Sequence, residues 1–330
     1  MHKPLKPPAL ASGSTIAVVS PASSAKQERV RRGCDNLEQL GYRVRDISAN
    51  RKPDGYFAGA LESRRKELQD ALTNPDFQAV FCSRGGYGSA ELLNELKTAR
   101  IKKPRIFCAF SDLTSLHIFL WQKLRWVTFY GPLVAGGFDA GANATSGYDP
   151  DSFMCAMTAT NSAWSTPLRG ETLVRGTARG VLLGGCVTLV ETSLGTPWEL
   201  DTRGAILLLE DRGLKPYQLD RMLLHLKQAG KFKGVRGIVL GEFPESDPPE
   251  GIVLMADCLS EDDDEACSAY SKAIVSCRKS KTPMVLVLAK KHREIKDRFA
   301  ETPLSRVLAD HPVTLRNIRV ALEELRPKSI

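Results

Sequence analysis

Two short apolar segments, each followed at once by a loop of small and polar residues, constrain this chain most strongly. Residues 79–83 lead into the glycine-rich loop 84–88, and residues 105–110 lead into Ser111 and Asp112. Short apolar runs bounded by turn residues are typical of buried strands in a parallel sheet. Because ligands bind outside the carboxyl ends of such strands, the two loops can supply one site from two directions.

The segments around this pair alternate between strand and helix patterns. An apolar run at 15–21 precedes a helical pattern at 27–40, a strand at 42–47 and a second helix at 64–72, which Asn74-Pro75 ends. This β-α-β order predicts an α/β fold with a parallel sheet flanked by helices on both faces, Rossmann-like or flavodoxin-like.

A chain of 330 residues exceeds what one hydrophobic core usually serves, which predicts two domains. We expect an N-terminal domain over 1–150 that carries both of these loops, with Ser111 and its possible role as a nucleophile. A linker over 151–179 follows, because positions 136–180 are rich in Gly, Ala, Ser and Thr and look like a surface crossing. A smaller C-terminal α/β domain then covers 180–330.

Composition narrows the range of partners. A net charge of +8 is compatible with an anionic partner, but no arginine-aromatic interleaving or nucleic-acid motif accompanies it, so no nucleic-acid partner is expected. No apolar run approaches the roughly 20 residues of a membrane span, and residues 1–13 lack the apolar stretch of a signal peptide. We therefore expect a cytoplasmic protein without a membrane partner. Eight cysteines without a Cys-x-x-Cys pair predict neither a disulfide framework nor a metal site.

Ser111 has two interpretations from its local residues. At a sharp strand-to-helix turn it could be a nucleophile, although Ala109 and Leu113 stand where the Gly-x-Ser-x-Gly motif has its glycines. It could instead cap the helix, with Asp112 adding favourable charge to the first turn. The local residues alone favour the cap.

The wider pattern changes this balance. Arg84-Gly85-Gly86-Tyr87-Gly88, followed by the Phe-Ser-Asp-Leu-Thr-Ser-Leu-His segment at 110–117, resembles the paired signature of the LD-carboxypeptidase family, which includes the microcin-immunity peptidases. The resemblance covers ordered blocks over about 14–290. It implies that Ser111 is the nucleophile and that the N–H groups of Asp112 and Gly86 form the oxyanion hole. Arg84 and Gly85 belong to the same substrate-binding loop. It also implies a homodimer, and the scheme needs no metal or organic cofactor.

The resemblance also assigns the other two members of the catalytic triad, the glutamate and the histidine. The strand at 205–211 ends in two carboxylates, and the first, Glu210, matches the glutamate that orients the catalytic histidine. Such a carboxylate holds the imidazole in its useful tautomer. The family histidine lies nine positions after a proline, which places it at His292, counted from Pro283. Lys291 there replaces the expected glycine, and Lys296 replaces an asparagine.

The other candidate base near the nucleophile is His117, which follows Ser111 by six residues on the predicted helix. Six residues exceed one helical turn, so its side chain would point away from the serine. We interpret His117 as a structural residue of the helix.

The resemblance implies a serine carboxypeptidase that removes the terminal D-alanine from murein tetrapeptides, at the L,D-bond after a diamino acid, in peptidoglycan recycling. One alternative is an immunity-type peptidase that hydrolyses a peptide-nucleotide, microcin-like antibiotic with the same triad. Another is a catalytically impaired, ligand-binding member. Its support is the altered surroundings of His292, at the start of the atypical segment 290–330 with ten Lys or Arg against six Asp or Glu. Separately, Cys186 stands where the family usually has an asparagine after Gly184-Gly185.

Overall fold

The computed structural model describes residues 3–49, 52–160, 170, 172–174 and 176–246, and the backbone of two further strands at 252–255 and 284–287. His292 and the segment 290–330 lie outside the described residues. The chain divides into two compact units, Met1–Pro167 with Leu183–Asp201, and Leu168–Leu182 with Thr202–Ile330. Within the described residues, every helix is too short or too polar to span a bilayer.

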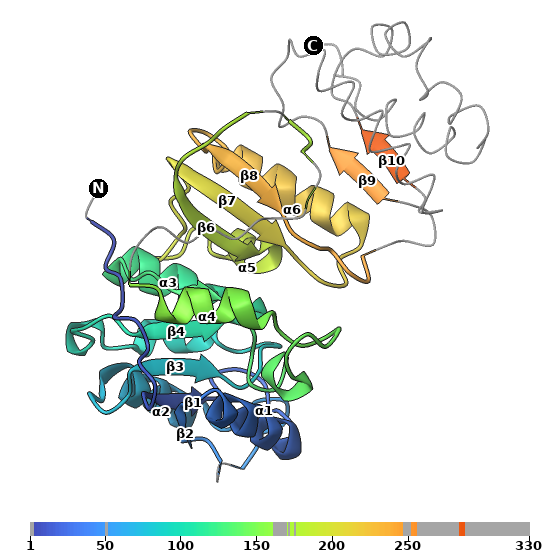
Figure 1. Cartoon of the computed structure of the whole chain (residues 1–330). Helices are drawn as coiled ribbons and strands as arrows, with labels where there is room; N and C mark the ends of the chain where they lie inside the picture. Colours follow the sequence, from blue (N-terminus) through green and yellow to red (C-terminus); the bar gives the residue numbers. More distant parts are fainter. Residues whose placement is uncertain are drawn as a thin grey trace, which may run out of the picture. The chain divides into compact units, whose positions relative to one another are not determined.

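The first unit is built on a five-stranded parallel sheet (Figure 1) with the order β2-β1-β3-β4-β5. The strands are β1 Thr15–Val19, β2 Arg43–Asp46, β3 Ala79–Cys82, β4 Ile106–Ala109 and β5 Phe129–Tyr130. The predicted α/β class and the parallel sheet are confirmed. The strand order is that of a flavodoxin-like sheet.

Helices cover both faces of this sheet. They are α1 Gln27–Gln39, α2 Leu61–Thr73, α3 Thr114–Leu124 and α4 Pro150–Thr158, with the short 3₁₀ turns η1 Ala90–Glu95, η2 Thr98–Arg100, η3 Ser111–Leu113 and η4 Phe138–Ala140. The short helix α5, Val187–Thr192, contacts α3. Side chains alternate between the faces along each strand. On β3, Val80 joins the core beneath α2 and α3, and Phe81 joins the core beneath α1 and α4.

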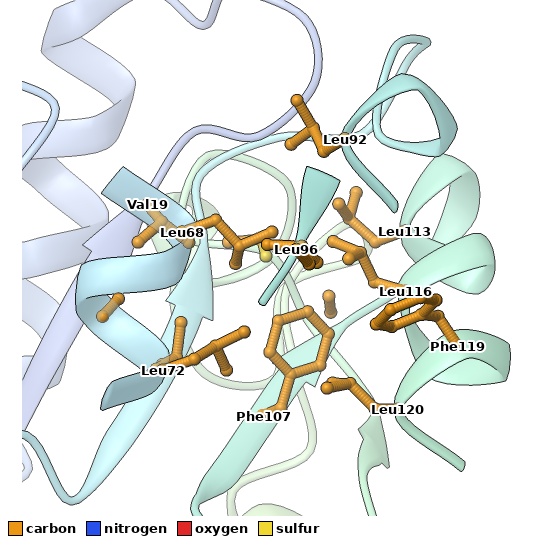
Figure 2. Close-up of a cluster of buried hydrophobic side chains, with 14 of the residues drawn as sticks. Val19, Leu68, Leu72, Leu92, Leu96, Phe107, Leu113, Leu116, Phe119 and Leu120 are labelled. Atoms are coloured by element: carbon orange, nitrogen blue, oxygen red, sulfur yellow. The ribbon is translucent and has the colours of Figure 1, made fainter. Parts of the chain in front are cut away.

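The first of these cores fixes the helix that follows Ser111. Phe107 of β4 lies among leucines of α2 and α3, with Leu116 and Leu120 of α3 fully buried (Figure 2). Burying each such side chain stabilises the fold by about 1.5–3 kcal/mol. The start of α3 is therefore held against a rigid sheet.

The interpretation of 136–180 as a surface crossing is wrong at η4 and α4. Phe138 is fully buried, and Phe153 of α4 packs edge-on against it with ring centroids 5.1 Å apart. Two helix-start signals were overlooked, Pro150 in the first turn and Asp149 as N-cap, whose Oδ1 accepts the Ser152 N–H at 2.6 Å. The limits of the two domains and of the linker stay predictions.

A three-stranded sheet has the order β6-β7-β8, formed by β6 Val181–Cys186, β7 Ala205–Glu210 and β8 Gly237–Leu240. Buried and half-buried residues alternate along β7, as expected for a strand with one face on a core. Helix α6, Pro216–Gln228, begins at a proline, whose fixed φ suits the first turn of a helix. The strands β9 Ile252–Met255 and β10 Met284–Val287 pair in parallel.

Candidate active site

The candidate site lies where the strand order of the first sheet reverses. Chain connections leave β1 and β3 in opposite directions, and ligand sites of open α/β sheets form at such switch points. The loop after β1 and the loop after β3 are joined here, because the Ser23 N–H donates to the Gly85 carbonyl at 3.2 Å and the Ser23 hydroxyl donates to the same oxygen. The loop after β4 adds Ser111.

Ser111 sits in a strained turn. Its φ is 66°, in the left-handed region that non-glycine residues avoid, and it is the first residue of the 3₁₀ turn η3, directly after an extended Phe110. Such a conformation costs roughly 1–3 kcal/mol and persists only where the surroundings enforce it. The side chain is half-buried. A serine on a strained strand-to-helix turn is the geometry of a nucleophile elbow.

The helix-cap interpretation of Ser111 is wrong. No side-chain cap bond is made at the start of η3 or α3, and Ser111 Oγ forms no hydrogen bond with any residue that the structure describes. Asp112 is buried and serves a different contact, since its Oδ2 accepts the Ser89 N–H at 2.9 Å. Burial raises the pKa of the Asp112 carboxyl, against the lowering effect of the bonds from Ser89.

The glycine loop runs directly beside the serine. A Cβ added to Gly85 would lie 3.0 Å from Ser111 Cβ and 3.1 Å from its Oγ. Gly86, with φ 95°, donates its N–H to none of the described residues. The Asp112 N–H is in the first helical turn, where intrahelical acceptors are missing. These two N–H groups are suited to stabilise an oxyanion.

The glycine loop is held by a buried arginine that the sequence analysis did not single out. Arg64 of α2 is 2% exposed and donates at 2.9 Å each to the carbonyls of Pro21, Gly59 and Gly88 and to Glu91. Its guanidinium lies 4.6 Å from the centre of the Phe57 ring. The signal was present, since Arg64 occupies a core position of the helical pattern that continues with Leu68. Arg84, by contrast, is exposed and donates to the Ser24 carbonyl at 2.8 Å.

The nucleophile turn is held by neutral groups. The Ser111 N–H donates to Tyr130 Oη at 3.1 Å, and the Thr114 hydroxyl donates to the Ser111 carbonyl at 2.7 Å. Ser111 therefore does not offer its own N–H to an oxyanion. Tyr130 was not predicted as a site residue, although its place at the carboxyl end of β5 was a usable signal.

His117 supports the same turn from within the core, which confirms its structural role. Its Nε2 lies 2.8 Å from the Ala109 carbonyl and so donates to it, which leaves Nδ1 to accept from Thr128 Oγ1 at 2.8 Å. Burial lowers the pKa of His117 to about 4. With both nitrogens engaged, the ring is neutral and is not a base for Ser111.

Two predicted residues remain, Glu210 and His292. Glu210 is the half-buried last residue of β7 in the second unit, followed by the buried Asp211. His292 is outside the described residues. The structure thus brings together Ser111, Asp112, Gly85 and Gly86, while the roles of Glu210 and His292 stay predictions. Among the described residues, no group of three His, Cys, Asp or Glu could hold a metal ion.

Comparison with known proteins agrees with this geometry. The family model of the LD-carboxypeptidase N-terminal domain matches residues 16–131, and that of the C-terminal domain matches 179–289. A probable murein peptide carboxypeptidase of Bacillus subtilis is 35% identical over 240 residues, which cover 72% of this chain and 75% of that protein. This chain belongs to the LD-carboxypeptidase family.

Other members of the LD-carboxypeptidase family extend the likeness. The crystal structure of a muramoyltetrapeptide carboxypeptidase from Oxalobacter formigenes superposes with a TM-score of 0.61 at 28% identity, over 83% of this chain and 87% of that one. The microcin C7 self-immunity protein MccF of Escherichia coli is 27% identical over 270 residues, 72% of this chain and 78% of its own. The predicted family is confirmed, and the chain is a serine-type carboxypeptidase that acts on peptides.

Proposed function

We propose that this carboxypeptidase removes the terminal D-alanine from murein tetrapeptides, at the L,D-bond that follows a diamino acid, in peptidoglycan recycling. The observation that carries the proposal is the strained Ser111 turn with Gly85 in contact with it. The murein peptide carboxypeptidase from Bacillus subtilis supports the substrate class.

In the proposed reaction, Ser111 Oγ attacks the carbonyl carbon of the scissile peptide bond and gives its proton to His292. The N–H groups of Asp112 and Gly86 stabilise the negative charge that develops on the carbonyl oxygen. His292 then protonates the leaving amine of D-alanine, and water releases the acyl group from Ser111 in the same manner. Glu210 orients His292 and stabilises its protonated form.

The scheme involves only side chains and backbone groups of the protein, with Arg84 and Gly85 in the loop that receives the peptide. A homodimer, a cytoplasmic location and the lack of nucleic-acid and membrane partners belong to the same proposal. They rest on the sequence and on the family resemblance.

A second candidate is an immunity-type peptidase that hydrolyses a peptide-nucleotide antibiotic. The relation to MccF of Escherichia coli supports it. The same serine machinery would act there, and only the groups that receive the nucleotide would differ.

The test is D-alanine release from purified murein tetrapeptide by the native chain, Ser111→Ala, His292→Ala and Glu210→Gln. We expect Ser111→Ala to lower kcat by about 10⁴-fold or more, because the nucleophile and its base act as one unit. Ser152→Ala, on α4 away from the switch point, is the matched control and should keep full activity. Undiminished D-alanine release by Ser111→Ala would show that Ser111 is not the nucleophile.

A parallel assay with an aminoacyl sulfamoyl nucleotide separates the two substrates. Release of the amino acid from this compound, without D-alanine release from the tetrapeptide, would favour the immunity function. Saturable tetrapeptide binding in calorimetry, with no turnover of either compound, would instead support the catalytically impaired, ligand-binding member.

A further inference from the structure

The backbone N–H and the backbone carbonyl of Ser111 are both hydrogen-bonded by one pair of hydroxyl groups, those of Tyr130 and Thr114. Tyr130 Oη accepts the Ser111 N–H at 3.1 Å, and Thr114 Oγ1 donates to the Ser111 carbonyl at 2.7 Å. The two hydroxyl oxygens are also 3.2 Å apart. Four atoms from β5, α3 and the nucleophile turn therefore form a single hydrogen-bonded group.

The positions of the hydrogens follow from counting donors. A threonine hydroxyl has one hydrogen and two lone pairs. Because Thr114 gives its hydrogen to the Ser111 carbonyl, Tyr130 must be the donor in the contact between the two hydroxyls. The second lone pair of Thr114 accepts the backbone N–H of Cys186 at 3.2 Å. All three positions on the Thr114 oxygen are used.

Packing fixes the tyrosine ring as well as its hydroxyl. A Cβ added to Gly185 would lie 2.7 Å from Tyr130 Cε2 and 2.9 Å from Thr114 Oγ1, so the backbone at Gly185 rests directly on this pair. The Tyr130 ring also contacts Phe110 and His117, with centroids 6.2 Å and 5.4 Å away. The ring has little room to leave the Ser111 N–H.

We propose that Tyr130 and Thr114 are positioning residues that hold Ser111 in its left-handed conformation and aim Oγ at the substrate carbonyl. By engaging the Ser111 N–H, Tyr130 also restricts the oxyanion hole to the N–H groups of Asp112 and Gly86. This inference rests on the proposed role of Ser111 as nucleophile. It adds two residues that act on the reaction through the serine and do not touch the substrate.

The hydrogen bonds from Tyr130 and Thr114 matter because the backbone of Ser111 is strained. A left-handed serine reverts to an ordinary conformation unless its surroundings oppose the change. Misplacing a reacting group by about 1 Å can lower the rate about a hundredfold, while contacts that bind the substrate elsewhere are kept. Loss of the pair should therefore lower kcat and leave KM nearly unchanged.

The experiment uses the full chain with Tyr130→Phe, Thr114→Val, Thr114→Ser and the double variant Tyr130→Phe/Thr114→Val. Two rates are measured for each, D-alanine release from the tetrapeptide and covalent labelling of Ser111 by a fluorophosphonate probe. Labelling reports the reactivity of the serine without needing the proposed substrate. Ser111→Ala shows which part of the labelling belongs to Ser111.

We expect Tyr130→Phe and Thr114→Val each to lower kcat and the labelling rate by about tenfold to a hundredfold at unchanged KM. Thr114→Ser keeps the hydroxyl and should restore both rates to within about twofold. The double variant should lose less than the product of the two single losses, because the pair acts as one unit.

Two matched controls separate positioning from general loss of structure. Tyr42→Phe removes a tyrosine hydroxyl whose one hydrogen bond among the described residues is to Met154 Sδ, at 3.9 Å. Thr73→Val removes a hydroxyl bonded at 2.8 Å to the Gln69 carbonyl on α2. Both should label at the native rate, with melting temperatures close to those of the test variants.

Native labelling rates in Tyr130→Phe and Thr114→Val would overturn the positioning role while leaving Ser111 as nucleophile. Equal losses in Thr114→Ser and Thr114→Val would also overturn it, because the hydroxyl would then be irrelevant. A native chain that is not labelled at Ser111 would overturn the proposed nucleophile and the positioning pair together.

Discussion

The candidate site has two walls, the glycine loop 84–88 and the turn at Ser111, and side chains of different charge hold them in place. The glycine loop is fixed by the buried cation of Arg64, which satisfies carbonyls of three loops, including that of Gly88. The nucleophile turn is fixed by neutral groups, namely Tyr130, Thr114 and the uncharged ring of His117. A guanidinium keeps its charge at every pH of interest, whereas an imidazole does not. The walls should therefore respond differently to mutation and to acid.

The difference follows from what each wall must do. The glycine loop has to keep N–H groups free for the oxyanion. Its carbonyl is therefore bound by Arg64, a side chain that only donates hydrogen bonds. The nucleophile turn has to hold a serine in an unfavourable backbone conformation, which needs both a donor and an acceptor at short range. Hydroxyl groups supply both.

The largest expected effect is on stability when the cation is removed. Arg64→Met leaves the carbonyls of three loops and the Glu91 carboxylate without their donor, and we expect a loss of about 3–5 kcal/mol in the free energy of unfolding by urea. Arg65→Met, on the same helix, removes only a surface pair with Glu62 and should change little. Equal stability of the two variants would show that the glycine loop does not depend on Arg64.

Acid should weaken the wall that contains His117. Its pKa of about 4 in the folded chain lies below the ordinary value of about 6.5, so the unfolded chain binds the proton first. The stabilisation is complete above pH about 6.5 and is lost as the pH falls towards 4, by up to about 3 kcal/mol. Urea unfolding of the native chain and His117→Gln across this window measures it. Parallel pH curves for the two proteins would contradict the prediction.

A methyl group on the glycine loop should affect the reaction more than the fold. Gly85→Ala places its Cβ against Ser111 Cβ and Oγ, and we expect a loss of about a hundredfold in kcat/KM for D-alanine release. Gly176→Ala is the matched control, because a Cβ there would meet nothing within 4 Å. Retained activity in Gly85→Ala would mean that the two walls are not in functional contact.

The smallest expected effect concerns the link between the walls. Ser89 ends the glycine-loop segment and donates its hydroxyl to the Asp112 carbonyl at 2.8 Å, beside Ser115 Oγ at 2.6 Å. Ser89→Ala keeps the backbone bond to the Asp112 carboxylate, so we expect a loss of only about 1 kcal/mol. Ser246→Ala gives the baseline in the same denaturation experiment, because the half-buried Ser246 hydroxyl makes only a long bond of 3.4 Å to the Pro244 carbonyl among the described residues. A loss as large as that of Arg64→Met would mean that the walls form one cooperative unit.

The sheet could be predicted from the sequence because its strands are short apolar runs between turns. The runs at 15–21, 79–83 and 105–110 correspond to β1, β3 and β4. Strand β5 is only Phe129–Tyr130, and its register pairs it with Cys108 and Ala109 of β4. Helix α4 was missed because it lies in a stretch of small residues that resembled a linker. Its buried Phe153 packs on Phe81 and Phe138, and the local sequence does not reveal these partners.

The site was predictable only where its residues are adjacent in sequence. The glycine loop and Ser111 follow strands that carry their own signal, and the family resemblance joined them. Arg64 bonds to Pro21 and Gly88, 43 and 24 residues away, and Tyr130 bonds to Ser111, 19 residues away. Only the folded chain shows those contacts. No local pattern specifies such partners.

The contacts of Arg64 also bear on the order of events in folding. One side chain on α2 closes hydrogen bonds to segments near residues 21, 59 and 88, so none of these segments is complete until that helix docks on the sheet. We therefore expect catalytic competence to appear late, after the sheet has formed. A nascent or partly folded chain would then be inert towards peptides until it matures.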